Sequence, residues 1–186
     1  ADRIEYVAPT DEGLLGEHAP TEDEIREIVA HRKEVEVAPG SNVVMLLDHS
    51  VEQMELDGSS RKIVTQILMA VNDTGRDQLT AQVLEYGRRK LYEAYAVAPD
   101  GTRSEATSIR DEEVRFGELK VGSTIVIQYR LDSYPMGYLA RYPDRRWFFH
   151  APGGQFERSE YVLILPKEMP FSEWGKGSWT RDEKIK

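Results

Sequence analysis

Residues 51–71 read VEQMELDGSSRKIVTQILMAV, two runs of alternating apolar and polar residues on either side of Asp57-Gly58. Residues 91–107, LYEAYAVAPDGTRSEAT, repeat this arrangement around Pro99-Asp100-Gly101. Asp-Gly between such runs is a strong hairpin signal, because both central residues of a type I′ turn adopt positive φ, which Gly and Asp tolerate best. The two segments therefore predict β-hairpins with type I′ turns in an antiparallel β protein.

Other stretches carry the same strand-like alternation. Residues 43–56 form a long strand-like run before the first turn. In residues 63–71 the odd-numbered and even-numbered positions fall on opposite faces, and both faces are partly apolar, which predicts a central strand. Residues 124–131 alternate similarly, and residues 147–151 and 156–165 are expected to form a final pair around Pro152-Gly153-Gly154.

The pattern amounts to about eight strands and one or two short helices, without the spacing of βαβ units. A two-layer antiparallel β-sandwich is the natural way to bury that many half-apolar strands. We therefore predict a mainly β fold, with the sandwich in residues 41–171. Residues 1–40 would be a lead-in segment with a short capped helix, and residues 172–186 a tail or the truncated start of a further strand.

The lead-in contains a helix start signal. Residues 1–20 are expected to be extended, with little packing power, whereas Thr21-Glu22-Asp23-Glu24 matches a capping box. A short helix is predicted from about Glu22 to Glu34 and ends before residues 38–41. Residues 72–75, Asn-Asp-Thr-Gly, are expected to form a turn, and residues 78–86 fit either a short helix or a strand.

Composition excludes several classes of function. The 186 residues carry a formal net charge of −9, which repels phosphate backbones, so nucleic acid is not expected as a partner. The apolar runs are too short to span a bilayer. The chain has no cysteine, which excludes disulfides, thiolate nucleophiles and cysteine-based zinc sites.

The residues that usually carry catalysis do not form a recognisable set. His18, His31, His49 and His150 have no helical ligand spacing and no suitable carboxylate motif beside them, so neither a metal nor another cofactor is expected. No serine lies in a G-x-S-x-G elbow. We therefore predict that this chain is not itself an enzyme.

One loop-like stretch differs from the rest of the acidic chain. Residues 134–147 read YPMGYLARYPDRRW and concentrate residue types that are enriched at binding hot spots. The candidate binding residues are Tyr134, Tyr138, Arg141, Tyr142, Arg145, Arg146 and Trp147. An alternative is that the aromatic side chains cover one end of the sandwich core while the arginines balance nearby acids.

In their order along the chain, several segments resemble an uncharacterised bacterial domain family that precedes transglutaminase-like domains. The match covers roughly residues 41–171. The segments that carry it are VEQMELDG at 51–58 with TQI at 65–67, AVAPDGT at 96–102, VRFGELKVGSTIVIQY at 114–129, and Phe148-Phe149 ahead of YVLILP at 161–166.

The resemblance implies a β-sandwich-like accessory domain of a larger, often exported bacterial protein, hence a periplasmic or extracellular location. It also implies a downstream catalytic domain with Cys, His and Asp, and it brings no catalytic residue to this chain. We expect a non-catalytic module whose partner is this neighbouring domain or another protein. The alternative is an independent carbohydrate- or peptide-binding sandwich that uses its Tyr and Trp side chains as stacking platforms.

Overall fold

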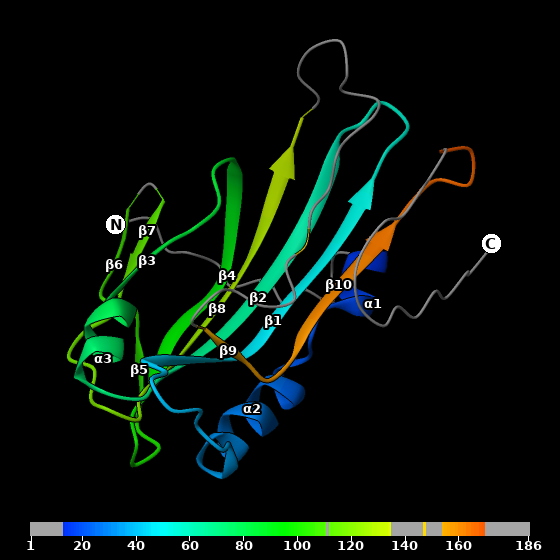
Figure 1. The fold of residues 1–186 in the computed structure, drawn as a ribbon. Helices are drawn as coiled ribbons and strands as arrows, with labels where there is room; N and C mark the ends of the chain where they lie inside the picture. Colours follow the sequence, from blue (N-terminus) through cyan, green and yellow to red (C-terminus); the bar gives the residue numbers. More distant parts are fainter. Residues whose placement is uncertain (1–12, 111, 135–146, 148–153, 170–186) are drawn as a thin grey trace.

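The computed structural model describes residues 13–110, 112–134, 147 and 154–169, which form two β-sheets with helices packed against them (Figure 1). The large sheet contains β1 (Val43–Met54), β2 (Ser60–Ala70), β4 (Arg88–Val97), β5 (Arg103–Glu105), β8 (Thr124–Ser133), β9 (Gln155–Phe156) and β10 (Ser159–Ile164). The small sheet contains β3 (Ala81–Val83), β6 (Ser108–Arg110) and β7 (Glu113–Arg115). The helices are α1 (Leu14–His18), α2 (Glu22–His31) with the 3-10 turn η2 (Arg32–Glu34), and α3 (Asp73–Leu79). The predicted mainly β, sandwich-like fold is confirmed.

The large sheet has the strand order β10-β1-β2-β8-β4-β5, and β9 pairs with the beginning of β1. The pairs from β1 to β5 are antiparallel, whereas β9 and β10 run parallel to β1. Strand β10, from the predicted strand at residues 156–165, thus pairs with β1, the first strand of the sheet. Residues 147–151 were its expected partner. Of that partner, residues 148–151 lie outside the described residues.

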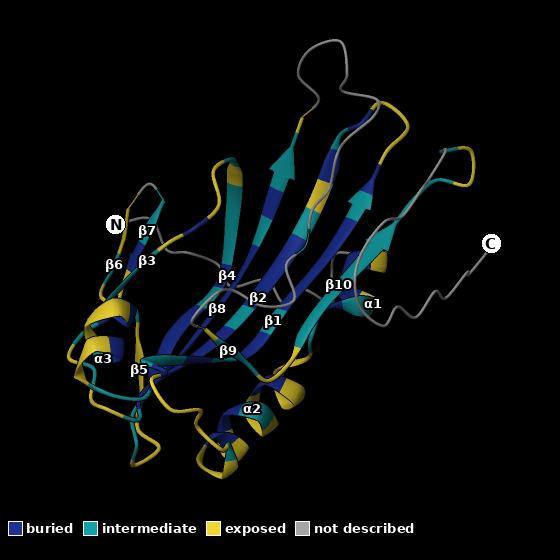
Figure 2. Ribbon diagram, in the orientation of Figure 1, coloured by how far each residue is buried: buried dark blue, intermediate teal, exposed yellow. Residues whose placement is uncertain are grey.

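Strand β2 is central, as its alternation predicts, with β1 on one side and β8 on the other. Ile63, Ile67 and Met69 are buried on one face, and Val64 and Leu68 are buried on the other. Figure 2 shows buried residues in dark blue along much of β2. Each side chain of this kind contributes roughly 1.5–3 kcal/mol when it is fully buried.

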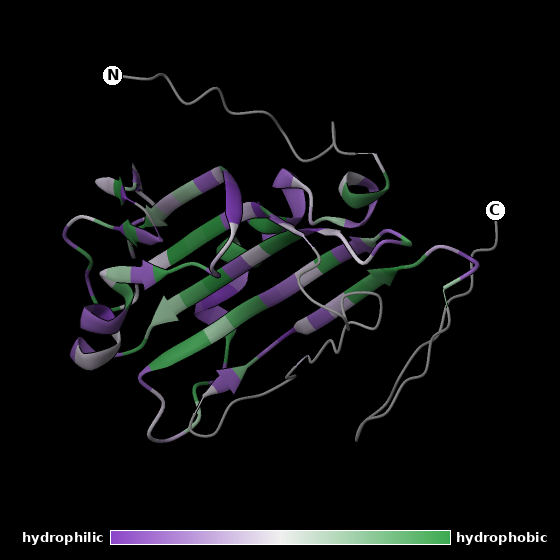
Figure 3. Cartoon of the chain, turned by 90° about the horizontal axis from the view of Figure 1, so that it is seen from above, coloured by the Kyte–Doolittle hydropathy of each residue, from purple (hydrophilic) through white to green (hydrophobic). Residues whose placement is uncertain are grey.

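The two faces of the large sheet are covered differently. Figure 3 shows hydrophobic residues along its strands, and these pack under different elements on the two sides. We call the side of the large sheet that packs against the small sheet the sandwich face and its other side the helix face. On the sandwich face, Leu79 of α3 and Val114 of β7 join the core. On the helix face, Leu15 of α1 and Ile25 and Val29 of α2 pack onto the strands. The fold is thus a sandwich of two sheets with a helical layer on its other side.

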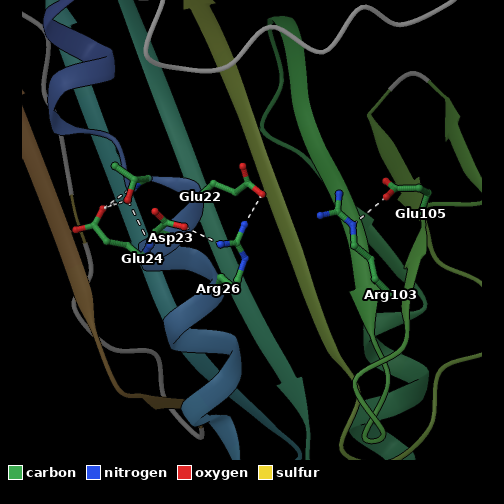
Figure 4. A network of polar contacts seen from close by, with 7 residues as sticks. Glu22, Asp23, Glu24, Arg26, Arg103 and Glu105 are labelled. Carbon is green, nitrogen blue, oxygen red and sulfur yellow. Dashed lines mark hydrogen bonds and ion pairs between the residues drawn. The ribbon is translucent and has the colours of Figure 1, made fainter.

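Helix α2 begins with the predicted capping box. The Thr21 amide donates to Oε2 of Glu24 over 2.7 Å, and the Glu24 amide donates to Oγ1 of Thr21 over 3.2 Å. Arg26 forms ion pairs with Glu22 and Asp23 in the first turn (Figure 4). Together α2 and η2 span residues 22–34, which matches the predicted helix.

Preceding α2, residues 14–18 form the short helix α1 where an extended chain was expected. Leu15 is 1% exposed and packs beside Val51 and Ile63 of the large sheet. The expectation of little packing power is therefore wrong for this part of the lead-in, because Leu15 and Ala19, which follows the helix, are both buried against the sheet.

The two Asp-Gly turns have a geometry that differs from the type I′ prediction. The Gly58 amide donates to the Glu55 carbonyl over 2.9 Å, the Glu55 amide donates to the Ser59 carbonyl over 2.9 Å, and Gly58 has a φ of 88°. The central residues of the turn are therefore Leu56 and Asp57, and the glycine follows as a bulge residue, a common form of the three-residue hairpin loop.

The second turn repeats this geometry at Ala98 to Thr102, with Gly101 at a φ of 93°. Pro99 occupies the first central position, for which its fixed φ is well suited. Oδ1 of Asp100 accepts a hydrogen bond of 2.9 Å from the Thr102 amide. This side-chain bond and the proline favour the bulged loop over a type I′ turn.

Residues 72–75 form the start of α3, so the predicted plain turn is wrong. Oδ1 of Asn72 caps the helix by accepting a hydrogen bond of 2.9 Å from the Gly75 amide. The helix packs so closely that a Cβ atom on Gly75 would lie 1.8 Å from the Asn42 carbonyl oxygen. Residues 78–86, which were predicted as either a short helix or a strand, contain parts of both, because α3 ends at Leu79 and β3 follows at Ala81–Val83.

Candidate functional site

Polar residues gather on the sandwich face along β1. Asp48, Ser50 and Glu52 alternate along this strand and share one side of it. Ser50 lies opposite Val64 of β2, which belongs to the core on the sandwich face. Because β1 lies near one edge of the large sheet, next to β10 (Figure 1), these polar residues meet the side chains of the edge strand.

Trp147 is packed onto this edge. Its ring is stacked on that of Tyr161 in β10, with the centroids 5.2 Å apart and an interplanar angle of 19°. Its Nε1 donates a hydrogen bond of 3.1 Å to Oγ of Ser159, and the Tyr161 hydroxyl donates one of 2.6 Å to Oε2 of Glu52. We call Trp147, Ser159, Tyr161 and Glu52 the edge cluster. It fixes an indole ring on a rigid sheet.

Charged side chains continue from the edge cluster across β1 and β2. Glu52 lies opposite Lys62, whose Nζ is 2.6 Å from a carboxylate oxygen of Glu85. Asp48 accepts a hydrogen bond of 3.3 Å from Nε2 of Gln66. Burial raises the pKa of Asp48, and the bond from Gln66 opposes this shift only in part. The area around the edge cluster is therefore acidic and partly desolvated.

Two of the predicted binding residues fall within the described residues, and they lie apart. Tyr134 follows β8 directly and is 64% exposed, whereas Trp147 packs on β10. The strands β2 and β1 lie between β8 and β10 in the sheet. The other five predicted residues, Tyr138, Arg141, Tyr142, Arg145 and Arg146, lie outside the described residues.

Sequence reasoning missed the partners of Trp147. A signal for Glu52 was present, because polar residues at positions 48, 50 and 52 interrupt one side of a strand that is otherwise largely apolar. Tyr161 gave no such signal. Its place beside Ser50 depends on the parallel pairing of β1 and β10, which joins segments more than 100 residues apart.

Other possible sites in the described ranges are less developed. No group of three or more His, Asp or Glu residues there is placed to hold a metal ion. A shallow depression is lined by Arg76, Thr80, Phe116, Gly117, Glu118 and Leu119. None of the helices in these ranges is long and apolar enough to cross a bilayer.

The edge cluster is suited to binding. The ring of Trp147 offers a flat apolar surface, which suits a partner side chain or a sugar ring. The stacked arrangement also holds the indole in one position before any partner arrives, which lowers the entropic cost of association.

Comparison with known proteins shows similarity of fold. No family model matches the chain, and no curated protein matches it. A candidate protease from Parabacteroides distasonis has a similar structure, with a TM-score of 0.54 and 16% identity over 69% of this chain and 30% of that protein. An M1 zinc metallopeptidase from Deinococcus radiodurans gives a TM-score of 0.31, with 16% identity over 52% of this chain and 22% of its own.

The first similarity concerns the fold alone, and the second is too low to carry an argument. In both cases this chain spans less than a third of the length of the matched protein.

Proposed function

We propose that this chain is a non-catalytic accessory domain of a larger, exported bacterial protein of the transglutaminase-like, cysteine protease-like kind. In this proposal it works in the periplasm or outside the cell and contacts the neighbouring catalytic domain. The resemblance of residues 41–171 to domains that precede transglutaminase-like domains supports the proposal. A similar fold that covers 30% of a longer protein is compatible with a modular role.

The observation that carries the proposal is the edge cluster. Trp147 closes the Tyr-, Trp- and Arg-rich segment at residues 134–147, and its stacking on Tyr161 anchors that end of the segment to the large sheet. Tryptophan, tyrosine and arginine are the residue types that most often dominate the binding energy of protein interfaces. Trp147, one of these residue types, is thus held on the edge of the large sheet.

Binding to the adjacent domain tests this proposal. The chain and the polypeptide encoded next to it are produced separately, and their dissociation constant is measured by isothermal titration calorimetry. We expect Trp147→Ala to weaken binding by about 30-fold, since a hot-spot truncation costs about 2 kcal/mol. Tyr86→Ala is the matched control, because Tyr86 is 88% exposed and belongs to the loop between β3 and β4 rather than to the edge cluster.

A folded Trp147→Ala variant that binds as tightly as the wild type would contradict this role for Trp147, and absence of binding by the wild type would refute the domain-contact proposal. Circular dichroism of each variant shows whether it is folded. Tyr161→Phe adds an independent test, because it keeps the stacked ring while it removes the hydrogen bond to Glu52. We expect it to bind more tightly than Trp147→Ala.

A second candidate function is the recognition of a glycan or peptide by the isolated domain. The indole of Trp147, which is stacked on Tyr161, favours this alternative, since it offers an aromatic surface for stacking. A glycan array and a peptide library probed with the wild type and Trp147→Ala test it. Binding that is lost in the variant supports this function, and a wild type that binds no glycan or peptide rules it out.

A further inference from the structure

The helix face of the large sheet contains a row of buried polar residues. His49 of β1 lies opposite Thr65 of β2, and Thr65 lies opposite Gln128 of β8. All three are at most 4% exposed. Burying polar side chains costs free energy unless hydrogen bonds compensate, so the partners of each residue decide how stable this row is.

Gln128 connects this row to the short segment that links α1 to α2. Its Nε2 donates hydrogen bonds of 3.0 Å to Oγ1 of Thr65 and 3.4 Å to the carbonyl oxygen of Pro20. Pro20 lies between the end of α1 and Thr21, which caps α2. The polar row therefore lies against the place where the two docked helices meet.

The row continues to Glu93 of β4, opposite Gln128, whose Oε2 is buried without a hydrogen-bond partner among the described residues. His49 is likewise uncompensated. Its Nδ1 is buried and has no hydrogen-bond partner among the residues that the structure describes. The charged or titratable groups that face it are His18 of α1, Glu24 of α2, Arg158 before β10 and Glu160 of β10. Arg158 and Glu160 pair with each other over 2.7 Å, and Glu24 accepts the capping hydrogen bonds from Thr21. Both carboxylates are thus already engaged.

We propose that His49 is a proton-sensitive latch, and that its protonation in mildly acidic solution releases the helix pair α1–α2 from the helix face. A charged imidazole at this position would be buried without a dedicated partner, whereas release of the helices would open it to water. Release would uncover the apolar side chains on which the helices pack, including Val51 and Ile63 under Leu15. The latch does not depend on the proposed contact at the edge cluster.

The direction of the pH effect follows from the two states of the imidazole. Desolvation lowers the pKa of His49 from 6.5 to about 4 in the docked state. In the released state we expect the ordinary value, so the released state binds protons more readily between pH 6.5 and pH 4. Docking is therefore strongest above pH 6.5 and weakens as the pH falls, by roughly 20-fold between pH 7 and pH 5.

At pH 5 the two carboxylates that face His49 do not change this direction. The hydrogen bonds from Thr21 and from Arg158 lower the pKa values of Glu24 and Glu160, respectively, so both stay ionised. Glu93 of β4, opposite Gln128, acts against release, because burial raises its pKa and its protonation in acid therefore favours the docked state. His31, at the exposed end of α2, has a raised pKa because its ring bonds to the Glu27 carbonyl. Its protonation in acid favours the helix and acts against release.

Hydrogen exchange of the full chain at pH 7 and pH 5, expressed as protection factors, tests the latch. A released α2 of 10 residues is too short to remain stably helical in water, so its amides exchange on release. We expect protection in residues 22–31 to fall by roughly 20-fold at pH 5 while β2 and β8 keep theirs. The fall should disappear in His49→Gln and persist in the control His31→Gln.

Unchanged protection of α2 in the wild type at pH 5 would overturn the proposal, as would a fall of the same size in His49→Gln. If His49→Gln does not fold, nuclear magnetic resonance of the wild-type His49 ring decides the question. The proposal requires that this ring stays neutral while α2 is protected and becomes charged together with the loss of protection. A ring that becomes charged near pH 6.5 while α2 stays protected refutes it.

Discussion

Replacing Gly75 by alanine sets two physical effects against each other. Gly75 lies in the first turn of α3, and alanine is favoured over glycine inside helices by about 0.8–1.0 kcal/mol. On helix propensity alone, Gly75→Ala would stabilise the protein. The added Cβ would, however, lie 1.8 Å from the carbonyl oxygen and 2.7 Å from the carbonyl carbon of Asn42. Both are backbone atoms, which cannot rotate away.

The clash can be relieved only by moving α3 away from the start of β1. That movement strains the hydrogen bond of 2.8 Å from the Val71 amide to the Asn42 carbonyl and the side-chain bond of 2.9 Å between Asn72 and Asn42. Each such bond contributes about 0.5–1.5 kcal/mol. Leu79, which is 2% exposed, would lose part of a burial that is worth roughly 1.5–3 kcal/mol. We expect a net loss of about 2–3 kcal/mol.

Urea denaturation followed by far-ultraviolet circular dichroism measures this change in the free energy of unfolding. Gly117→Ala is the matched control, because a Cβ there meets only the Thr107 methyl group, at 3.2 Å. We expect the control to change stability by less than about 1 kcal/mol. A Gly75→Ala protein as stable as the wild type, or more stable, would show that the contact with Asn42 does not govern this position.

Two further predictions concern polar side chains. Thr21→Ala removes the hydroxyl of the capping box and should lower the free energy of unfolding by about 1 kcal/mol in urea denaturation, whereas Thr21→Ser should keep wild-type stability. Asp48→Asn should raise the melting temperature at pH 7 but not at pH 3, because a carboxyl whose pKa is raised by burial disfavours folding only above its ordinary pKa. An equal increase in melting temperature at both pH values would contradict this predicted pH dependence.

Features encoded by short stretches of sequence were predictable. The alternation in β2 assigned Ile63 and Val64 to opposite faces correctly, and the capping box placed the start of α2 at Thr21. Both signals depend on residues within one strand or one helical turn. The Asp-Gly hairpins were also predicted, although the type of turn was wrong because the side chain of Asp100 and the ring of Pro99 favour a bulged loop.

Features that depend on distant segments were not predictable. The parallel pairing of β10 with β1 has no local signature, so the contacts of Tyr161 with Trp147 and Glu52 could not be foreseen. Helix α3 is short, and its glycine reads as a turn residue until its close packing on Asn42 is known. The candidate site was thus predictable in part: Trp147 was selected for its residue type, while its supporting partners come from tertiary structure.

The parallel pairing of β1 with β10 also determines when the sheet can be completed during synthesis. Asp48 pairs with Ser159, so the ribosome must add 111 residues after Asp48 before the outer edge of β1 finds its partner. Until then this 12-residue strand can pair with β2 alone, and its other backbone groups remain open to strands of other chains. Non-local pairing of this kind slows folding. Nascent chains that end before residue 159 should therefore be the form of this protein most prone to aggregation.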